Sequence, residues 1–227
     1  MIGAALRTRP HTLRRMSAVR TVTLSPTELR AAELDGELTR VGDAFLPIDV
    51  PVGAADRARS MSAVRRESRL FVQRRSAAWV YGWCAEPATP SLAASIGSRV
   101  PSGTRMRTGA RELVIDADDL QLVGGVLVTT PVRTLLDLAR ANDDECPLAD
   151  LHRMIELSGL GADAVLEALT AARRAPYTAR ARQRLLAVAD AVHVVHRVDP
   201  AHGVQNAVEV RDVAHLENEL RDGQAVA

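Results

Sequence analysis

The chain has 227 residues, of which 47% are hydrophobic and 25% charged, so it is long enough and apolar enough to bury a core. All 29 basic residues are arginine, which excludes the lysines that P-loop proteins, Schiff-base enzymes and kinases require. The two cysteines, Cys84 and Cys146, form neither a disulfide framework nor a zinc site by themselves, and we expect two reduced thiols.

The net charge of +1 conceals an uneven distribution along the chain. Residues 1–115 contain 18 arginines and 10 acidic residues, whereas residues 116–227 contain 11 arginines and 18 acidic residues. A basic first half suits a polyanionic partner. The sequence has no apolar run of membrane-spanning length and no secretory signal at its N-terminus, so we expect a cytoplasmic protein that does not contact a membrane.

The first fifty residues indicate a basic arm, a capped helix and a β-hairpin. Ser25, Pro26 and Glu28 have the spacing of a capping box with proline at the first helical position. The apolar stretches "ELTRV" and "AFLPI" flank Gly42 and Asp43, which predicts a hairpin. A helix followed at once by a hairpin is typical of the end of a winged helix. Only about twenty residues precede this helix, so the predicted winged helix is abbreviated.

Exposed polar side chains of this unit are candidates for DNA contact. Thr27 and Arg30 lie on the predicted helix, and Arg40 lies in the predicted hairpin. Arginine can bind both phosphates and guanine edges. The alternative is a plain helix–hairpin unit within a larger domain, and Glu33 makes this helix less basic than a DNA-binding helix usually is.

Residues 53–83 predict a helix, the short strand "RLFVQ" and the short helix "SAAWVYGW". The second helix carries Trp79, Tyr81 and Trp83 beside Arg74 and Arg75, a combination that can stack nucleic-acid bases. Aromatic residues in such a helix more often belong to the core, and we favour that interpretation.

Alternating apolar and polar residues over 91–129 predict three strands, with turns at residues 101–103, 116–119 and 124–125. Four arginines near the first turn form either a phosphate-contacting patch or a solvated loop: Arg99, Arg105, Arg107 and Arg111. The "DADD" stretch at 116–119 can bind a hard metal ion, but a polar turn between strands uses the same residues and is far commoner.

The remaining elements are predicted to be helices. Thr130 caps a helix that has Pro131 at its first position and an apolar stripe along one face. On its other face, Arg133 and Asp137 are four residues apart and predict a weakly stabilising ion pair. Two further helices are predicted over 148–174, with a break at 158–161, and a last helix begins near Tyr177.

Three stretches together resemble the AbiEi-type antitoxins, which are transcriptional regulators of type IV toxin–antitoxin (abortive infection) systems. They are "GELTRVGDAFLP" in the wing, "QRRSAAWVYGW" in the central strand and helix, and "VLVTTPVRTLLDLAR" at the start of the following helix. The last is the most specific, and the order and spacing of all three support the resemblance. It covers about residues 22–190.

The resemblance implies an α+β protein with an N-terminal winged helix, followed by a mixed strand–helix antitoxin domain with a helical C-terminal section. We place the arm and abbreviated winged helix in residues 1–52, the antitoxin domain in 53–190 and a polar tail in 191–227. The implied partners are double-stranded operator DNA and a nucleotidyltransferase-like toxin. No catalysis, cofactor or small-molecule substrate is expected. At matching positions, the implied DNA-binding residues are Thr27, Arg30 and Arg40, with Arg14 and Arg15 as upstream backbone contacts.

The tail offers an alternative function, because it also resembles Vsr-like endonuclease domains. Asp199 and Glu209 have the separation of a carboxylate pair that holds Mg²⁺ for phosphodiester hydrolysis. The usual lysine is absent and few residues follow Glu209, so we expect a truncated remnant. His193 and His196 are three residues apart, but solvated histidines are expected there. A further alternative is a protein-interaction module whose DNA-binding unit has decayed.

Overall fold

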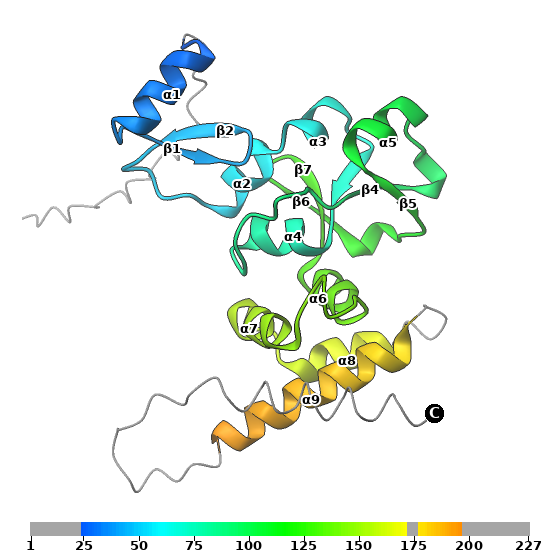
Figure 1. Ribbon diagram of the computed structural model, residues 1–227. Coiled ribbons are helices and arrows are strands. Elements are labelled where there is room, and N and C mark those ends of the chain that lie inside the picture. The colour runs from blue at the N-terminus through cyan, green and yellow to red at the C-terminus, as the bar shows by residue number, and fades with distance from the viewer. Residues whose placement is uncertain (1–23, 172–176, 197–227) are drawn as a thin grey trace, which may run out of the picture. The chain divides into compact units, whose positions relative to one another are not determined.

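The computed structural model describes residues 24–171 and 177–196 (Figure 1). Contacts divide the chain into two compact units, with the boundary between Val52 and Gly53. Both units contain helices and strands, and the predicted α+β class is confirmed. Within the described ranges, no helix is both long enough and apolar enough to cross a membrane.

The first unit contains a helix and a two-stranded hairpin, namely α1 (Pro26–Leu34), β1 (Leu38–Val41) and β2 (Ala44–Pro47). The predicted capping box is confirmed, since the Glu28 amide donates to Ser25 Oγ at 3.3 Å and the Ser25 amide donates to Glu28 Oε2 at 2.6 Å. The hairpin turns at Gly42, which has a φ of +57°. Helix and hairpin are therefore as predicted, while their assignment to a winged helix stays a prediction.

The second unit begins with two short helices, α2 (Ala54–Ser60) and α3 (Ser62–Arg66), where the sequence predicts one helix. The helical backbone is interrupted at Met61, whose ψ of 92° is extended. The Met61 side chain is 7% exposed, so its burial offsets the missing helical hydrogen bonds. Tertiary packing therefore overrides the continuous helical propensity of this stretch.

A five-stranded mixed sheet forms the centre of the second unit (Figure 1), in the order β5-β4-β3-β7-β6. The β3–β7 and β4–β5 pairs are parallel, and the β3–β4 and β6–β7 pairs are antiparallel. Strand β3 is fully buried in the middle of this sheet. The strands are β3 (Leu70–Val72), β4 (Leu92–Ser95), β5 (Arg111–Leu113), β6 (Leu120–Val123) and β7 (Val126–Thr129).

The region between β4 and β5 differs from the prediction. The predicted turn at 101–103 is the start of helix α5 (Ser102–Thr108), and residues 91–129 form four strands instead of three. Pro101 precedes the helix, and Gly109 ends it in the left-handed conformation, with a φ of +63°. The sequence between them is polar and has no apolar stripe, so hydrophobic periodicity gives no sign of this helix.

The helical section follows β7, and its elements are as predicted. Thr130 Oγ1 accepts a hydrogen bond from the Arg133 amide at 3.4 Å, which confirms the predicted cap. Helix α6 contacts four other helices and is the centre of a hydrophobic cluster that includes Leu135, Leu138 and Leu151. The helices are α4 (Arg74–Tyr81), which precedes β4, and α6 (Pro131–Ala139), α7 (Leu148–Ser158), α8 (Ala162–Ala171) and α9 (Thr178–His196).

Candidate functional site

The structure places three of the predicted DNA-binding residues on the surface of the first unit. Thr27 and Arg30 are exposed one turn apart on α1, and Arg40 is exposed on β1. Arg30 forms an ion pair with Glu33, and Arg40 Nε donates to the carbonyl oxygen of Gly42 at 3.0 Å. Within the described residues, no hydrogen bond or ion pair links Arg40 to the two α1 residues.

The described part of the first unit is acidic. Residues 24–52 contain two arginines and six acidic residues, and the Arg30 charge is balanced by an adjacent carboxylate. A net negative surface repels a phosphate backbone, so this segment by itself offers little electrostatic attraction to DNA. The five arginines of residues 1–23, including Arg14 and Arg15, lie outside the described residues.

The alternative catalytic pair, Asp199 and Glu209, also lies outside the described residues. His193 and His196 lie in the last turns of α9, beyond the residues whose side chains are described. Across the side chains that the structure does describe, no group of three histidine, cysteine or acidic residues is arranged to hold a metal ion.

The arginines around residue 101 are brought together only in part. Arg105 Nη1 and Arg99 Nε lie 3.2 and 3.9 Å from the same oxygen, Oε2 of Glu112. Arg107 is exposed on α5, where it donates to Thr104 Oγ1 at 3.4 Å. Arg111 precedes Glu112 on β5, so its side chain leaves the opposite face of the sheet. Of the four predicted arginines, Arg99 and Arg105 are therefore the two that a shared contact brings together within the described residues.

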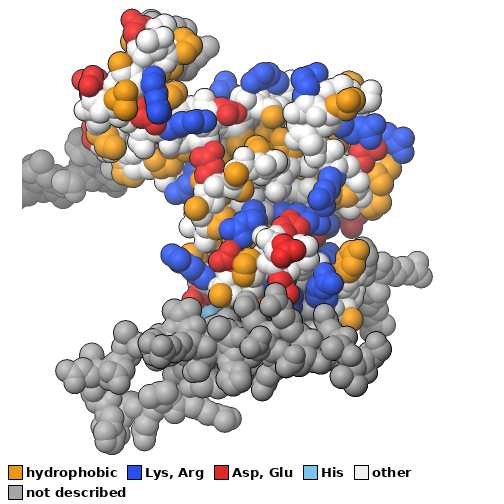
Figure 2. Space-filling view, in the orientation of Figure 1, with side chains coloured by type: hydrophobic (Ala, Val, Ile, Leu, Met, Phe, Trp, Pro, Cys, Tyr) orange, Lys and Arg blue, Asp and Glu red, His pale blue; other side chains and the backbone are white. Residues whose placement is uncertain are grey.

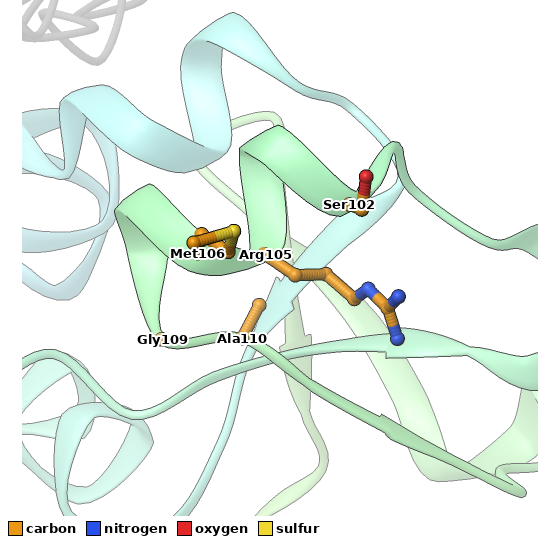
Figure 3. Close-up of a pocket in the computed structure, with 5 residues that line it drawn as sticks. All are labelled: Ser102, Arg105, Met106, Gly109 and Ala110. Atoms are coloured by element: carbon orange, nitrogen blue, oxygen red, sulfur yellow. The ribbon is translucent and has the colours of Figure 1, made fainter.

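Arg105 lines a shallow pocket between α5 and the start of β5 (Figure 3). The side chains of Arg105 and Met106 point in opposite directions there, and Met106 is 86% exposed. The other lining residues are small: Ser102, Gly109 and Ala110. The cation of this pocket, Arg105, is already paired with the Glu112 carboxylate, so its charge is largely balanced.

The acidic stretch at 116–119 forms a short 3-10 helix between β5 and β6. Asp119 Oδ2 lies 2.5 Å from Arg133 Nη1, and Arg133 Nε donates to Asp137 Oδ2 at 2.9 Å. Asp137 is only 8% exposed and also accepts from Arg140 at 3.3 Å. The predicted Arg133–Asp137 ion pair is therefore confirmed, and it belongs to a half-buried network that holds the start of β6 against α6.

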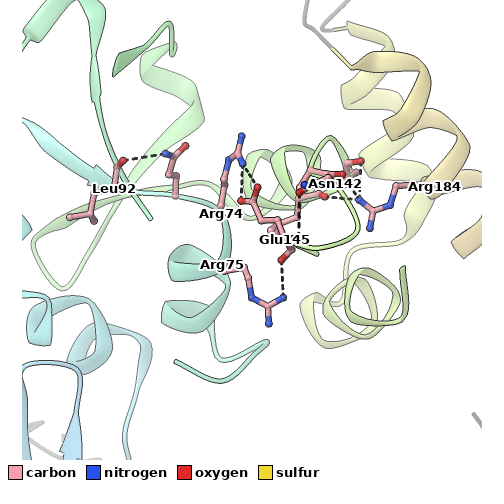
Figure 4. Close-up of polar contacts among 10 residues, drawn as sticks. Arg74, Arg75, Leu92, Asn142, Glu145 and Arg184 are labelled. Carbon is pink, nitrogen blue, oxygen red and sulfur yellow. Dashed lines mark hydrogen bonds and ion pairs between the residues drawn. The ribbon is translucent and has the colours of Figure 1, made fainter. Parts of the chain in front are cut away.

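The side chains of Arg74 and Arg75 form ion pairs within the protein and are therefore not free to stack on bases (Figure 4). Arg74 Nη1 contacts both carboxylate oxygens of Glu145, at 2.5 and 2.7 Å. Arg75 Nη1 donates to Asp150 Oδ2 at 2.8 Å and to the Glu145 carbonyl at 3.2 Å. Arg184 reaches the same loop from α9, on the other side (Figure 4). These arginines connect α4 to the helical section.

The aromatic residues at the end of α4 and directly after it belong to the core, as favoured from the sequence. Trp79 and Trp83 are each 7% exposed, and the rings of Tyr81 and Trp83 lie 4.7 Å apart. Tyr81 Oη donates to the Thr129 carbonyl at 2.5 Å and accepts from Gln121 at 2.9 Å. Burial raises the pKa of Tyr81 to about 12, so its hydroxyl group stays protonated and remains a donor.

The comparisons with known proteins decide the family. Residues 69–188 match the model of the AbiEi antitoxin C-terminal domain, which is more than half of the chain. The chain belongs to the AbiEi antitoxin family. This membership assigns it an antitoxin role in a toxin–antitoxin system, and the resemblance noted from the sequence is confirmed.

The other comparisons add little to this assignment. The crystal structure of the RV2827C protein from Mycobacterium tuberculosis is similar at 16% identity, over 72% of this chain and 68% of that chain, with a TM-score of 0.30. A likeness at this level supports no further inference. The curated proteins give no match.

The AbiEi antitoxin domain extends from the residue before β3 into α9, and its most specific stretch is structural. Residues 126–140 form β7, a strand of the sheet, and α6, which packs against four other helices. The arginine contacts to Glu145, Asp150 and the loop carbonyls were not predicted from the sequence. An arginine pair and an acidic loop about 70 residues apart share no periodic pattern that would indicate a contact between them.

Proposed function

We propose that this chain is a DNA-binding, antitoxin-type transcriptional regulator of a type IV toxin–antitoxin system, with no catalytic activity of its own. Membership of the AbiEi antitoxin family carries the proposal. A regulator of this kind binds the operator of its own operon and, separately, counteracts a nucleotidyltransferase-like toxin. The first unit is the candidate for operator recognition, and the second half of the chain is the candidate for toxin contact.

Operator recognition is proposed to use the helix and hairpin of the first unit. Thr27 and Arg30 are one turn apart and both exposed, so they can reach one groove together. Arg40 lies on β1 and is proposed to contact the phosphate backbone, and Arg14 and Arg15 are proposed as upstream contacts. Arg30 must exchange its Glu33 partner for DNA, which reduces the net gain from that contact.

The test is binding of the purified full chain to its own upstream DNA and to scrambled DNA of the same composition, across a salt series. We expect a preference for the upstream DNA that survives competitor. The double variant Arg30→Ala with Arg40→Ala is expected to lose this preference. The control is Arg153→Ala with Arg182→Ala, which removes two exposed arginines from the helical section and should retain it.

One observation favours a second candidate, a protein-interaction module that no longer binds a specific operator. The described part of the first unit is acidic, with six acidic residues against two arginines. This candidate predicts equal affinity for upstream and scrambled DNA, together with retained binding of a toxin encoded beside the gene. That pair of results would contradict operator recognition and leave the antitoxin role intact.

A further inference from the structure

Strand β6 forms one edge of the five-stranded sheet and carries no charge. Figure 2 shows arginine side chains gathered over α3 and α5 of the same unit, whereas β6 has the sequence LQLV. The strand at the opposite edge, β5, contains Arg111 and Glu112. Natural sheets usually protect their edges from further pairing with charged residues, proline or a bulge. Strand β5 follows this rule, and β6 does not.

The register of the β6–β7 hairpin leaves backbone groups of β6 without a partner strand. Val123 lies opposite Val126 across a two-residue glycine turn. In such a hairpin the residues that flank the turn exchange both hydrogen bonds, and every second pair does the same. The series continues at Asp119, whose carbonyl accepts from the Thr130 amide at 2.8 Å. The N–H and C=O of Leu122 therefore point away from β7, and no backbone group of the described residues bonds to them.

The Leu122 side chain is 70% exposed beside these backbone groups. It lies opposite Leu127 of β7, which is half-buried, and Leu120 is on the same face of β6. Helix α2 contacts both β6 and β7 but leaves Leu122 uncovered. An added β-strand needs both features, because its main chain bonds to the free edge and its apolar side chains pack along the exposed row.

The charges around β6 favour a second copy of this chain as the added strand. The acidic stretch 116–119 precedes β6, and the uncharged turn 124–125 follows it. When two β6 strands pair antiparallel, the acidic stretch of each copy lies beside the glycine turn of the other, so the carboxylates are not opposed. A charged peptide finds no complementary charge along β6 itself.

The same antiparallel pairing satisfies the free backbone groups symmetrically. The Leu120 amide already donates to the Ala117 carbonyl, which leaves the Leu120 carbonyl as a free acceptor within the described residues. The Leu122 amide of each copy can then donate to the Leu120 carbonyl of the other. A two-fold contact of this kind uses the same surface on both copies, and it brings the leucines of both strands into one apolar row.

We propose that β6 is a self-association edge, through which two copies of this chain pair antiparallel and join their sheets. This inference goes beyond the proposed function and does not depend on it, because it requires no contact with DNA or with a toxin. Four residues on each side form a small interface, so the dimer is expected to be weak and reversible.

The experiment is analytical ultracentrifugation of the full chain from about 1 µM to about 1 mM. The test variant is Leu122→Lys, because lysine is a common natural means of preventing edge pairing. The matched control is Leu157→Lys, which makes the same change at another exposed leucine, 52% exposed on α7. Circular dichroism checks that both variants are folded. A second measurement on the unchanged chain, hydrogen exchange of the Leu122 amide at low and high protein concentration, needs no variant.

We expect a concentration-dependent dimer of the parent chain, which Leu122→Lys weakens at least about tenfold because two like charges then lie close together. The control should dimerise as the parent does, and exchange of the Leu122 amide should slow as the parent concentration rises. A parent chain that stays monomeric to about 1 mM would overturn the inference. So would equal weakening in the control, or a dimer in which the Leu122 amide exchanges as fast as in the monomer. DNA binding is not measured, so failure of operator recognition would leave this result unchanged.

Discussion

The guanidinium group of Arg184, on α9, donates a hydrogen bond to the carbonyl oxygen of Ala141 at 2.8 Å. The same Nη1 lies 3.2 Å from the Leu138 carbonyl, and Nη2 donates to the Cys146 carbonyl. One buried side chain thus provides donors for the carbonyls at the end of α6 and in the loop that follows, where the helix dipole is negative. Arg184 is 4% exposed, and its nearest described carboxylate, on Asp143, is 3.7 Å away.

Replacing Arg184 with methionine should therefore destabilise the fold strongly. Arg184→Met keeps much of the side-chain volume but leaves buried carbonyl oxygens without a donor, and we expect a decrease of about 2–4 kcal/mol in the free energy of unfolding. Arg182→Met, an exposed site two residues earlier, should change it by less than about 0.5 kcal/mol. Urea denaturation of both variants checks this, and similar midpoints would show that the carbonyl contacts contribute nothing.

The two glycines of the β6–β7 turn should differ in their tolerance of alanine. Gly124 and Gly125 both have positive φ, at +60° and +84°, so a side chain strains either position. A Cβ atom on Gly124 would also lie 2.6 Å from the Ala55 carbonyl oxygen, whereas one on Gly125 meets no atom within 4 Å. We expect Gly125→Ala to cost about 1 kcal/mol and Gly124→Ala clearly more. Equal thermal midpoints would mean that α2 does not pack against this turn in solution.

Arg74 adopts the left-handed region, with a φ of +48°, at the start of α4. Arg74→Gly and Arg74→Ala both remove the ion pair with Glu145, but only glycine relieves the backbone strain. We expect the glycine variant to be the more stable of the two by about 1 kcal/mol. Within a regular helix the order is reversed by a similar amount. Chemical denaturation of the two variants distinguishes these cases, and a more stable alanine variant would show that residue 74 is helical in solution.

Elements with caps or strong periodicity were predictable from the sequence, and elements that depend on distant contacts were not. The capping box at Ser25 and the Thr130 cap involve residues only three apart, so they can be read directly. The break at Met61 and helix α5 were missed, because their causes are burial and flanking residues rather than a periodic pattern. The parallel pairing of β3 with β7 joins residues more than fifty apart and had no local signal.

The sequence identified arginines as the candidate binding residues, but it did not indicate which of them are exposed. The charge count indicated correctly that the first 115 residues are basic, but it did not show where the excess lies. The structure shows that the arginines of α4 are used in ion pairs and that Arg111 faces away from Glu112. Only a three-dimensional arrangement could separate these arginines from the ones that remain exposed near α3 and α5, because all of them look alike in the sequence.

The buried thiol of Cys146 should make stability fall at high pH. Burial raises its pKa from 9.0 to about 11, although the Arg184 and Arg75 guanidinium groups oppose this. Between about pH 9 and pH 11 the unfolded thiol loses its proton while the folded thiol keeps it, so the unfolded state gains stability relative to the native state. The native state should lose up to about 2–3 kcal/mol over this range through Cys146 alone.

Comparison with Cys146→Ala isolates this contribution, because the variant retains Cys84 and Tyr81, whose pKa values are also raised by burial. The measurement is the free energy of unfolding of both proteins in urea, with reductant, from pH 8 to pH 10.5. The difference between them should be constant up to about pH 9 and then shrink as the parent chain loses the advantage of its buried thiol. A difference that stays constant to pH 10.5 would mean that the Cys146 thiol titrates normally, and therefore that the loop held by Arg184 opens to solvent.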